Sequence, residues 1–286
     1  MRLRRGLGHL SMPLSMLRTF RGHFWNNGFL RVLIYHDVPP AFFDAFKQQM
    51  EFALKYYTFV SPELFIRMRE QSMPIIGGNL LLTFDDGFKS NRYIAEKILG
   101  PLGIKALFFV ATDFVACMNR QAEKNFIADN LFDGKISADD IPDHLQSMEW
   151  SDLHYLLERG HTIGSHTKTH VKLSMVNESE ILEREIVESG DILQNRLGAP
   201  IVTFAYPFGD IDSINSEALL VAGNRYQFVF SGIRGRNHPE VCSRALRRDA
   251  VSLNDPLPYF QFILEGGLSP WYCKNQKKLD KMISGL

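Results

Sequence analysis

Short apolar runs alternate along the chain with stretches in which apolar residues recur every three or four positions. LLLTF at 80–84 is apolar apart from one threonine, which is typical of a strand covered on both faces, and KALFFV at 105–110 is similar. Amphipathic spacing predicts helices, most clearly at 42–56 and 178–197. The expected strands are 31–35, 58–60, 80–84, 105–110, 161–164, 201–205 and 227–230, and the expected helices are 42–56, 88–99, 151–158 capped by Ser151, 178–197 and 256–264.

This alternation of strands and helices predicts an α/β fold with a parallel sheet, either open or closed into a barrel. In both forms ligands bind at the carboxyl ends of the strands, so residues that directly follow a strand are the candidates for function. The stretch 119–147 mixes charge, glycine and proline, and it predicts an insertion with one or two short helices. The helix at 256–264 is expected to be the last substantial one.

The charge balance narrows the function classes. Thirty-two basic and thirty-two acidic residues cancel in a chain of 286, so no overall field favours nucleic acid or an anionic membrane. No run of about 18 apolar residues occurs, so we expect no segment that crosses a bilayer. Cys117, Cys242 and Cys273 are too widely spaced in the sequence for a CxxC metal site.

The chain begins with a basic arm in which arginines have no acidic neighbours. They are Arg2, Arg4, Arg5, Arg18 and Arg21. Such an arm either contacts lipid head groups or is a solvated terminus. The apolar stretch at 7–17 is interrupted by polar residues, and no clear cleavage site of small residues follows it. We therefore expect a cytoplasmic protein, with peripheral contact at the inner membrane face as an option.

Two adjacent carboxylates, Asp85 and Asp86, directly follow the strand at 80–84. They repel each other, and both lose water if they are buried, so a fold seldom keeps such a pair for stability alone. A bound cation would relieve the repulsion, and Gly87 would let the backbone turn tightly beside it. The alternative is a turn with a helix cap, which is a common role for aspartate.

Two histidines, His166 and His170, follow the expected strand at 161–164 and lie four positions apart. If this turn is helical, the spacing places both imidazoles on one side, where they can bind one ion. A histidine pair alone is weak evidence, but a second cluster at a neighbouring strand end strengthens it. One carboxylate and two imidazoles suit zinc or a similar divalent ion and leave coordination positions open.

Three segments together resemble the NodB-like polysaccharide deacetylases, which are carbohydrate esterase family four. They are TFDDG at 83–87, HTKTH at 166–170 and FAYPFG at 204–209. The resemblance implies a distorted (β/α) barrel of about seven parallel strands in a single domain. It also implies the roles of five residues: Asp85 is the general base, Asp86, His166 and His170 bind the metal, and the backbone N–H of Phe208 stabilises the oxyanion.

The chain departs from the commonest pattern of this family at two places. Many members have an arginine where this chain has Ala205, and that arginine orients the catalytic aspartate. Arg248, within RALRRD at 244–249, is our candidate to replace it; the alternative is a basic surface strand. Many members also have a Leu-x-His segment near the end that supplies the general acid, and nothing after Gly209 matches it.

The missing histidine has an equivalent near the start of the chain, in IYHD at 34–37. This resembles family branches that are circularly permuted. His36 is therefore the expected general acid, with Asp37 as its partner or as a wall of the site; the alternative is a histidine that bridges polar groups at a strand end. His144 and His161 lack a strand-end position, and His238 is expected in a loop.

These residues predict a metal-dependent hydrolase that removes the N-acetyl group of an amino sugar and releases acetate. The substrate is expected to be a polysaccharide, an oligosaccharide or a lipid-linked glycan precursor, as in cell-surface polysaccharide biosynthesis. The alternatives are a deformylase of a lipid-linked amino sugar, an O-deacetylase, and a barrel that binds glycan without turnover. Zinc is the expected ion, and Co²⁺, Ni²⁺ and Mn²⁺ have compatible ligand preferences.

The sequence also suggests residues that contact substrate and a division of the chain. Tyr206, Asp37 and Arg248 are candidates for substrate contact. Aromatic side chains that would stack on sugar rings, unless they belong to the core, are Phe42, Phe43, Trp150 and Tyr206. We expect a basic arm at 1–28, a catalytic domain at 29–270 and a tail at 271–286.

Overall fold

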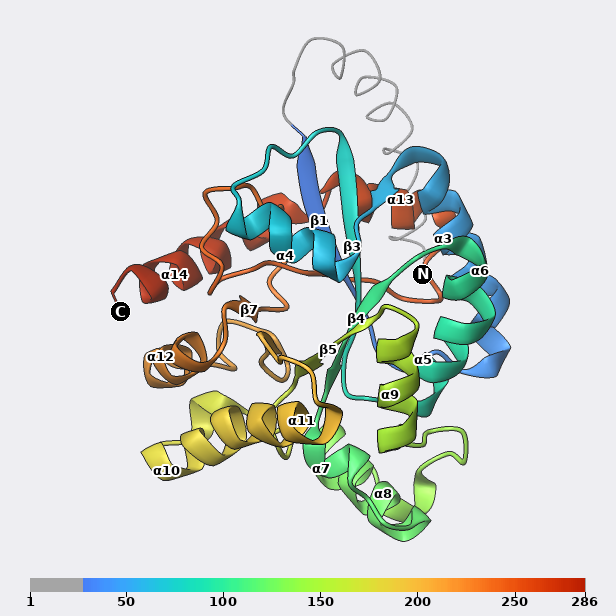
Figure 1. The fold of residues 1–286 in the computed structure, drawn as a ribbon, viewed down its shortest axis with the longest axis vertical. Helices are drawn as coiled ribbons and strands as arrows, with labels where there is room; N and C mark the ends of the chain where they lie inside the picture. Colours follow the sequence, from blue (N-terminus) through green and yellow to red (C-terminus); the bar gives the residue numbers. More distant parts are fainter. Residues whose placement is uncertain (1–27, 286) are drawn as a thin grey trace.

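Parallel strands form one curved sheet at the centre of the molecule (Figure 1). The computed structural model describes residues 28–285, so the expected basic arm lies almost entirely outside the described residues. Seven strands follow one another in the order β7-β6-β5-β4-β3-β1-β8, and β2 pairs with β3 beside this row. The strands are β1 (Phe29–Tyr35), β2 (Thr58–Phe59), β3 (Gly78–Phe84), β4 (Ala106–Val110), β5 (Thr162–Ser165), β6 (Thr203–Ala205), β7 (Phe228–Phe230) and β8 (Asp249–Ala250).

The two outer strands of this row are joined by one segment of chain. Leu246 pairs in parallel with Phe230 of β7, and three residues later β8 pairs with β1. The sheet therefore curls into a distorted barrel, which confirms the expected fold class. Because the strands are parallel, the residues that follow β1, β3, β4 and β5 lie at the same edge of the barrel.

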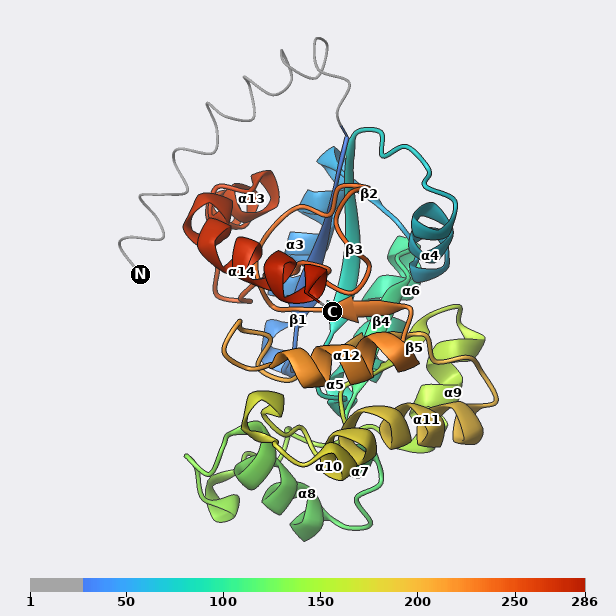
Figure 2. The ribbon, with the colours of Figure 1, turned by 90° about the vertical axis from the view of Figure 1, so that its left-hand side faces the viewer.

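Helices surround the strands, and α7, α8 and α10 lie together at one end of the molecule (Figures 1 and 2). The α-helices are α3 (Phe43–Tyr56), α4 (Pro62–Glu70), α5 (Lys89–Ile94), α6 (Gly100–Leu102), α7 (Thr112–Val115), α8 (Arg120–Phe126), α9 (Trp150–Glu158), α10 (Ser179–Leu182), α11 (Ser189–Leu197), α12 (Ser216–Arg225), α13 (Leu257–Glu265) and α14 (Cys273–Ser284). Short 3₁₀ turns are η1 (Pro40–Phe42), η4 (Ala138–Asp140), η5 (Leu173–Met175) and η7 (Ser269–Tyr272), and π-helical segments are η2 (Ala95–Leu99), η3 (Ile127–Leu131) and η6 (Glu183–Glu188). Within residues 28–285, no helix is long and apolar enough to cross a membrane.

Several sequence predictions of local structure are confirmed, two are wrong, and two helices were not expected. The helix expected at 178–197 is present as the continuous run α10, η6 and α11, and the insertion contains α8, η3 and η4. Ser151 does not cap α9, because Glu149 is the N-cap and forms a capping box with Asp152. The helix expected at 256–264 is present as α13, but it is not the last substantial one, because α14 follows it and buries Leu279 completely. Helices α4 and α12 were not expected.

Helix α4 helps to fill the barrel interior. Its Phe65 has 0% of its surface exposed and packs on two rings of β7, with ring centroids 5.6 Å from Phe228 and 5.7 Å from Phe230. These residues form a cluster with buried side chains from the other strands, including Leu81 and Phe109. The interior is therefore a packed core, and in barrels of this kind ligands bind at the carboxyl ends of the strands.

We expect Phe65→Ala to lower the free energy of unfolding by about 3–5 kcal/mol, since it leaves a cavity that the surrounding strands cannot fill. Urea denaturation at unchanged m-value measures this. Tyr56→Ala is the control, because Tyr56 is 66% exposed at the end of α3 and should cost less than about 0.5 kcal/mol. Equal stability losses in the two variants would contradict the assignment of Phe65 to the core.

Candidate metal centre and active site

The adjacent carboxylates Asp85 and Asp86 lie buried at the end of β3, with 4% and 6% of their surfaces exposed. The backbone turns sharply here, because Asp86 has φ +74° and Gly87 has φ +103°. A left-handed aspartate is costly and is found mostly where the surrounding structure requires it. The turn directs the two carboxylates to different partners, so their charges are offset separately.

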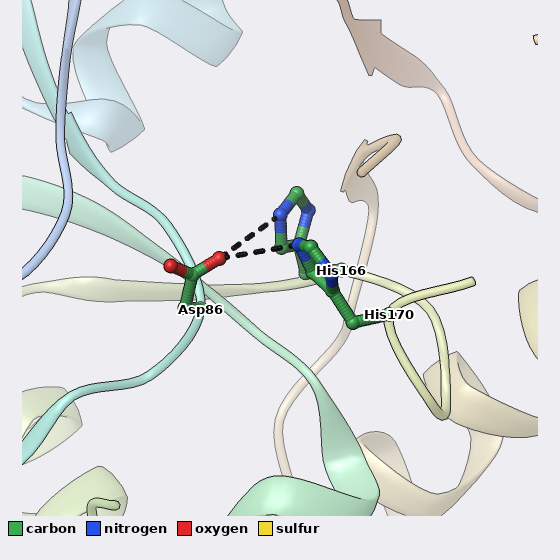
Figure 3. A group of neighbouring side chains, drawn as sticks. All are labelled: Asp86, His166 and His170. Atoms are coloured by element: carbon green, nitrogen blue, oxygen red, sulfur yellow. Dashed lines mark ion pairs between the residues drawn. The ribbon is translucent and has the colours of Figure 1, made fainter. Parts of the chain in front are cut away.

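Asp86, His166 and His170 point toward one another (Figure 3), and one potential ligand atom from each lies within 4.8 Å of the others. Asp86 Oδ1 is 3.5 Å from His166 Nε2 and 3.4 Å from His170 Nε2. Tetrahedral ligands of zinc, with bonds of about 2.0–2.1 Å, are about 3.3 Å apart. The donor set and its spacing therefore fit a divalent ion.

The histidine loop is not helical, so helical spacing is not what places the two imidazoles on one side. Thr167 has φ +66° and His170 has φ +62°, so two left-handed residues bring the imidazoles together instead. Each ring also has a fixed tautomer, because a carbonyl can only accept a hydrogen bond. Nδ1–H of His166 donates to the Ala205 carbonyl at 2.7 Å, and that of His170 donates to the Asn130 carbonyl at 3.0 Å. Both Nε2 atoms thus face Asp86: a neutral ring offers its Nε2 lone pair to an ion, and a protonated ring donates its Nε2–H to the carboxylate.

The electrostatics of this group favour a cation. Burial would raise the pKa of Asp86, but hydrogen bonds from His166 and His170 hold it well below its usual value. Burial would likewise lower the pKa of His170, and the Asp86 carboxylate more than offsets this and raises it. The buried carboxylate therefore stays ionised and attracts positive charge to the two Nε2 atoms.

Arg248 provides the counter-charge for Asp85. Nη1 and Nη2 donate to Oδ1 and Oδ2 at 2.6 and 2.9 Å, and the guanidinium also donates to the Ser231 carbonyl. Burial would raise the pKa of Asp85, but Arg248 and His166 lower it below its usual value. Arg248 is 1% exposed, which excludes the alternative of a surface strand and places it where the sequence analysis expected a replacement for the arginine absent at Ala205.

His36 and Asp37 follow β1 at the same edge of the barrel. His36 is exposed. Its charge also lowers the pKa of Asp85 and of Asp86, although burial and the residues that bond directly to these carboxylates have larger effects. Asp37 accepts a hydrogen bond from Ser90 at 2.7 Å, and its Oδ2 is 3.7 Å from His144 Nε2. Burial raises the pKa of Asp37.

His144 was set aside for lack of a strand-end position, but long-range pairing brings it to Asp37. The segment just after it pairs antiparallel with the chain that follows Asp86, through the bridge between Phe88 and Ser147. His238 lies elsewhere, since the neighbouring Asn237 N–H donates to the Leu30 carbonyl near the start of β1. His161 is a buried residue whose Nδ1 accepts from the Ala106 N–H at 3.1 Å.

The aromatic candidates differ in exposure. Phe208 is 45% exposed, has φ +62°, and lies with its ring centroid 4.9 Å from that of His170. Gly209 next to it also has φ +67°, and a Cβ there would lie 2.6 Å from the Gly232 nitrogen, so only glycine fits. Tyr206 is 1% exposed, so the expectation that its ring stacks on a sugar is wrong. Arg196 lies over the ring of Trp150, at 5.4 Å from its centroid.

Comparison with known proteins gives a family and a set of similar folds. A family model described as polysaccharide deacetylase matches residues 77–226. No curated protein matches the chain.

Solved structures with similar folds cover most of the chain. The Streptococcus pyogenes deacetylase PplD in complex with acetate is 19% identical with a TM-score of 0.64, covering 83% of this chain and 99% of that one. IcaB from Ammonifex degensii is 20% identical with a TM-score of 0.65, covering 84% and 99%. The BpsB deacetylase domain from Bordetella bronchiseptica is 20% identical with a TM-score of 0.60, covering 79% and 97%. At these identities the likeness concerns the fold alone.

Removing the guanidinium of Arg248 should leave the buried Asp85 carboxylate without a counter-charge. We expect Arg248→Met to lower the free energy of unfolding by about 3–5 kcal/mol at pH 7, and Asp85→Leu/Arg248→Met to recover most of this loss. Urea denaturation of the metal-free proteins measures both. A loss below about 1 kcal/mol would contradict a buried ion pair at this site.

The same variant should respond to pH in a defined direction. In the wild type, the lowered pKa of Asp85 contributes stability above the unfolded pKa of about 3.9, and this is lost as the pH falls through the folded value. In Arg248→Met the largest influence that lowers the pKa of Asp85 is lost while burial still raises it, so the carboxyl is protonated more readily. The stability difference between the two proteins should therefore shrink from pH 7 to pH 4.

Proposed function

The chain belongs to the polysaccharide deacetylase family, and we propose that it is a metal-dependent N-deacetylase of an amino sugar in a glycan. As a member of this family it is a hydrolase of carbon–nitrogen bonds that deacetylates glycans. The observation that carries the finer proposal is the pairing of Asp86 with two Nε2 atoms beside a separate carboxylate, Asp85, held by Arg248. This gives one group to hold an ion and another to move a proton.

Asp86, His166 and His170 would hold the ion, with zinc as the expected metal and Co²⁺, Ni²⁺ or Mn²⁺ as compatible ions. When bound, such an ion polarises a carbonyl oxygen and lowers the pKa of a water. The Ala205 and Asn130 carbonyls hold the two rings in the tautomer that ligation requires.

The proposed proton transfers use residues at the same edge of the barrel. Asp85, kept ionised by Arg248, accepts the proton of the attacking water. The backbone N–H of Phe208 donates to the oxygen on which negative charge develops. His36 donates a proton to the leaving nitrogen, because an amine cannot leave as an anion. Acetate and a free amino sugar are the products.

The substrate and its location extend the proposal. We place the enzyme in cell-surface polysaccharide biosynthesis, acting in the cytoplasm on an N-acetylated polysaccharide, oligosaccharide or lipid-linked precursor. The support is the sequence: the motif pattern indicates the glycan substrate, and the basic arm at 1–28 fits peripheral membrane contact. Cell fractionation that recovered the protein outside the cytoplasm would contradict this location.

Acetate release from an N-acetylated chito-oligosaccharide by the zinc-loaded protein tests the proposed reaction. The product should lose the mass of one acetyl group per site and gain a free amine. Parallel arms use an N-formylated and an O-acetylated sugar, since a deformylase or an O-deacetylase would use the same residues. Binding of the oligosaccharide without release from any arm would contradict an enzyme and indicate a glycan-binding barrel.

The two carboxylates should separate in their variants. Asp85→Asn should retain metal but lose turnover by about 10²-fold or more, because it removes the base. Asp86→Asn should lose metal as well as turnover, because it removes a ligand. Metal content after dialysis and the turnover number measure these effects, with Asp191→Asn on α11 as a control that should match the wild type. The reverse pattern would show that the two roles are exchanged.

His36→Ala should bind metal and fold normally but lower kcat by about 10²–10⁴-fold, since the leaving nitrogen loses its proton donor. The alkaline limb of the pH–rate profile should shift or disappear. His154→Ala, an exposed histidine on α9, is the matched control. Near-normal turnover with an unchanged profile would remove His36 from the mechanism and make His144 the next candidate.

A further inference from the structure

The loop 167–170 between the two histidine ligands is held in a strained form by residues outside the ligand set. Its first and last residues, Thr167 and His170, are both left-handed without being glycine. Such a conformation costs roughly 1–3 kcal/mol per residue and persists only where other contacts enforce it. The backbone N–H groups of Thr112 and Asp113 donate to carbonyls of the loop, and two side chains add further contacts, those of Glu185 and Asn130.

Glu185 contacts the middle of the loop from the π-helical segment η6. It is 2% exposed, and its Oε2 accepts from the backbone N–H groups of Lys168 at 3.2 Å and Thr169 at 2.8 Å. Its Oε1 accepts from the Thr169 hydroxyl at 3.0 Å, and its backbone carbonyl also accepts from the Lys168 N–H. A buried carboxylate thus replaces the water that would otherwise solvate these donors.

Asn130 contacts the end of the loop from a second π-helical segment, η3, within the insertion. Its side-chain amide donates to the Thr169 carbonyl at 2.8 Å. Its backbone carbonyl accepts from Nδ1–H of His170 at 3.0 Å. The last four carbonyls of a helix lack intrahelical partners, so the end of the run α8–η3 can direct one of them at the imidazole. π-Helical turns are rare and are often found at functional sites.

We propose that Glu185 and Asn130 are positioning residues that preorganise His170 for the metal, so that the insertion at 119–147 is part of the metal centre. The inference rests on the proposed metal-dependent function. Glu185 fixes the path of the loop, and Asn130 fixes both its end and the tautomer of the ligand. Outer partners of metal ligands typically contribute 10–100-fold in metal affinity.

The test measures Co²⁺ affinity by chelator competition, together with the visible absorption spectrum of the bound ion. Glu185→Gln places an amide –NH₂ or a weaker acceptor against the loop donors, and Asn130→Ala removes the contact to the Thr169 carbonyl. Each should weaken Co²⁺ binding by about 10–100-fold and alter the spectrum. Thr169→Val, which removes only the hydroxyl bonded to Glu185, should give about tenfold weaker binding and serves if Glu185→Gln does not fold.

The matched controls are Glu183→Gln, an exposed carboxylate in the same π-helical segment, and Asn125→Ala on α8. Both should keep wild-type affinity and spectrum. Thermal unfolding of every metal-free variant shows whether weaker Co²⁺ binding comes from a misplaced ligand or from a less stable protein.

If the wild type binds Co²⁺ one-to-one and the Glu185 and Asn130 variants bind within about twofold with unchanged spectra, the inference fails and the metal-dependent function stands. Equal weakening in Glu183→Gln would also overturn it. A wild type that binds no Co²⁺ would refute the proposed function itself.

Discussion

The structure depends on keeping two adjacent buried carboxylates ionised at the end of one strand. Asp85 and Asp86 are 4% and 6% exposed, so neither can rely on water, and their charges repel. The left-handed turn at Asp86 separates their surroundings. Arg248 offsets the charge of one, and two imidazoles with the proposed ion offset the charge of the other. The same separation gives the two carboxylates the different roles that the proposed chemistry needs, with Asp85 as the base and Asp86 as a metal ligand.

The barrel meets this requirement by bringing distant segments to one edge. Asp85 follows β3 and His166 follows β5, on either side of β4, while Arg248 comes from the segment that joins β7 to β1. The segment that closes the barrel therefore also supplies the arginine that offsets the charge of Asp85. The histidine loop contains two left-handed residues, and Glu185 and Asn130 bond to it from outside the ligand set.

The sequence predicted what depends on local pattern or on a shared motif. The strands at 80–84 and 105–110 were evident because strands buried on both faces are continuously apolar, and Asp86, His166 and His170 were evident from strand-end position and family resemblance. Helix α4 was missed although Ser61 and Pro62 are a typical start, and Ser61 does accept from the Leu64 N–H. Helix α12 has a similar signal in Asn215. His144, Glu185 and Asn130 could not be predicted, since their positions depend on pairing between segments far apart in the chain.

An anomalous diffraction map of crystals grown with Zn²⁺ tests the division between the two carboxylates most directly. The account predicts one anomalous peak per chain, bonded at about 2.0–2.2 Å to Asp86, His166 Nε2 and His170 Nε2. Asp85 should remain bound to Arg248 and outside the coordination sphere. A peak coordinated by Asp85, or an ion bound elsewhere with this group empty, would contradict the account.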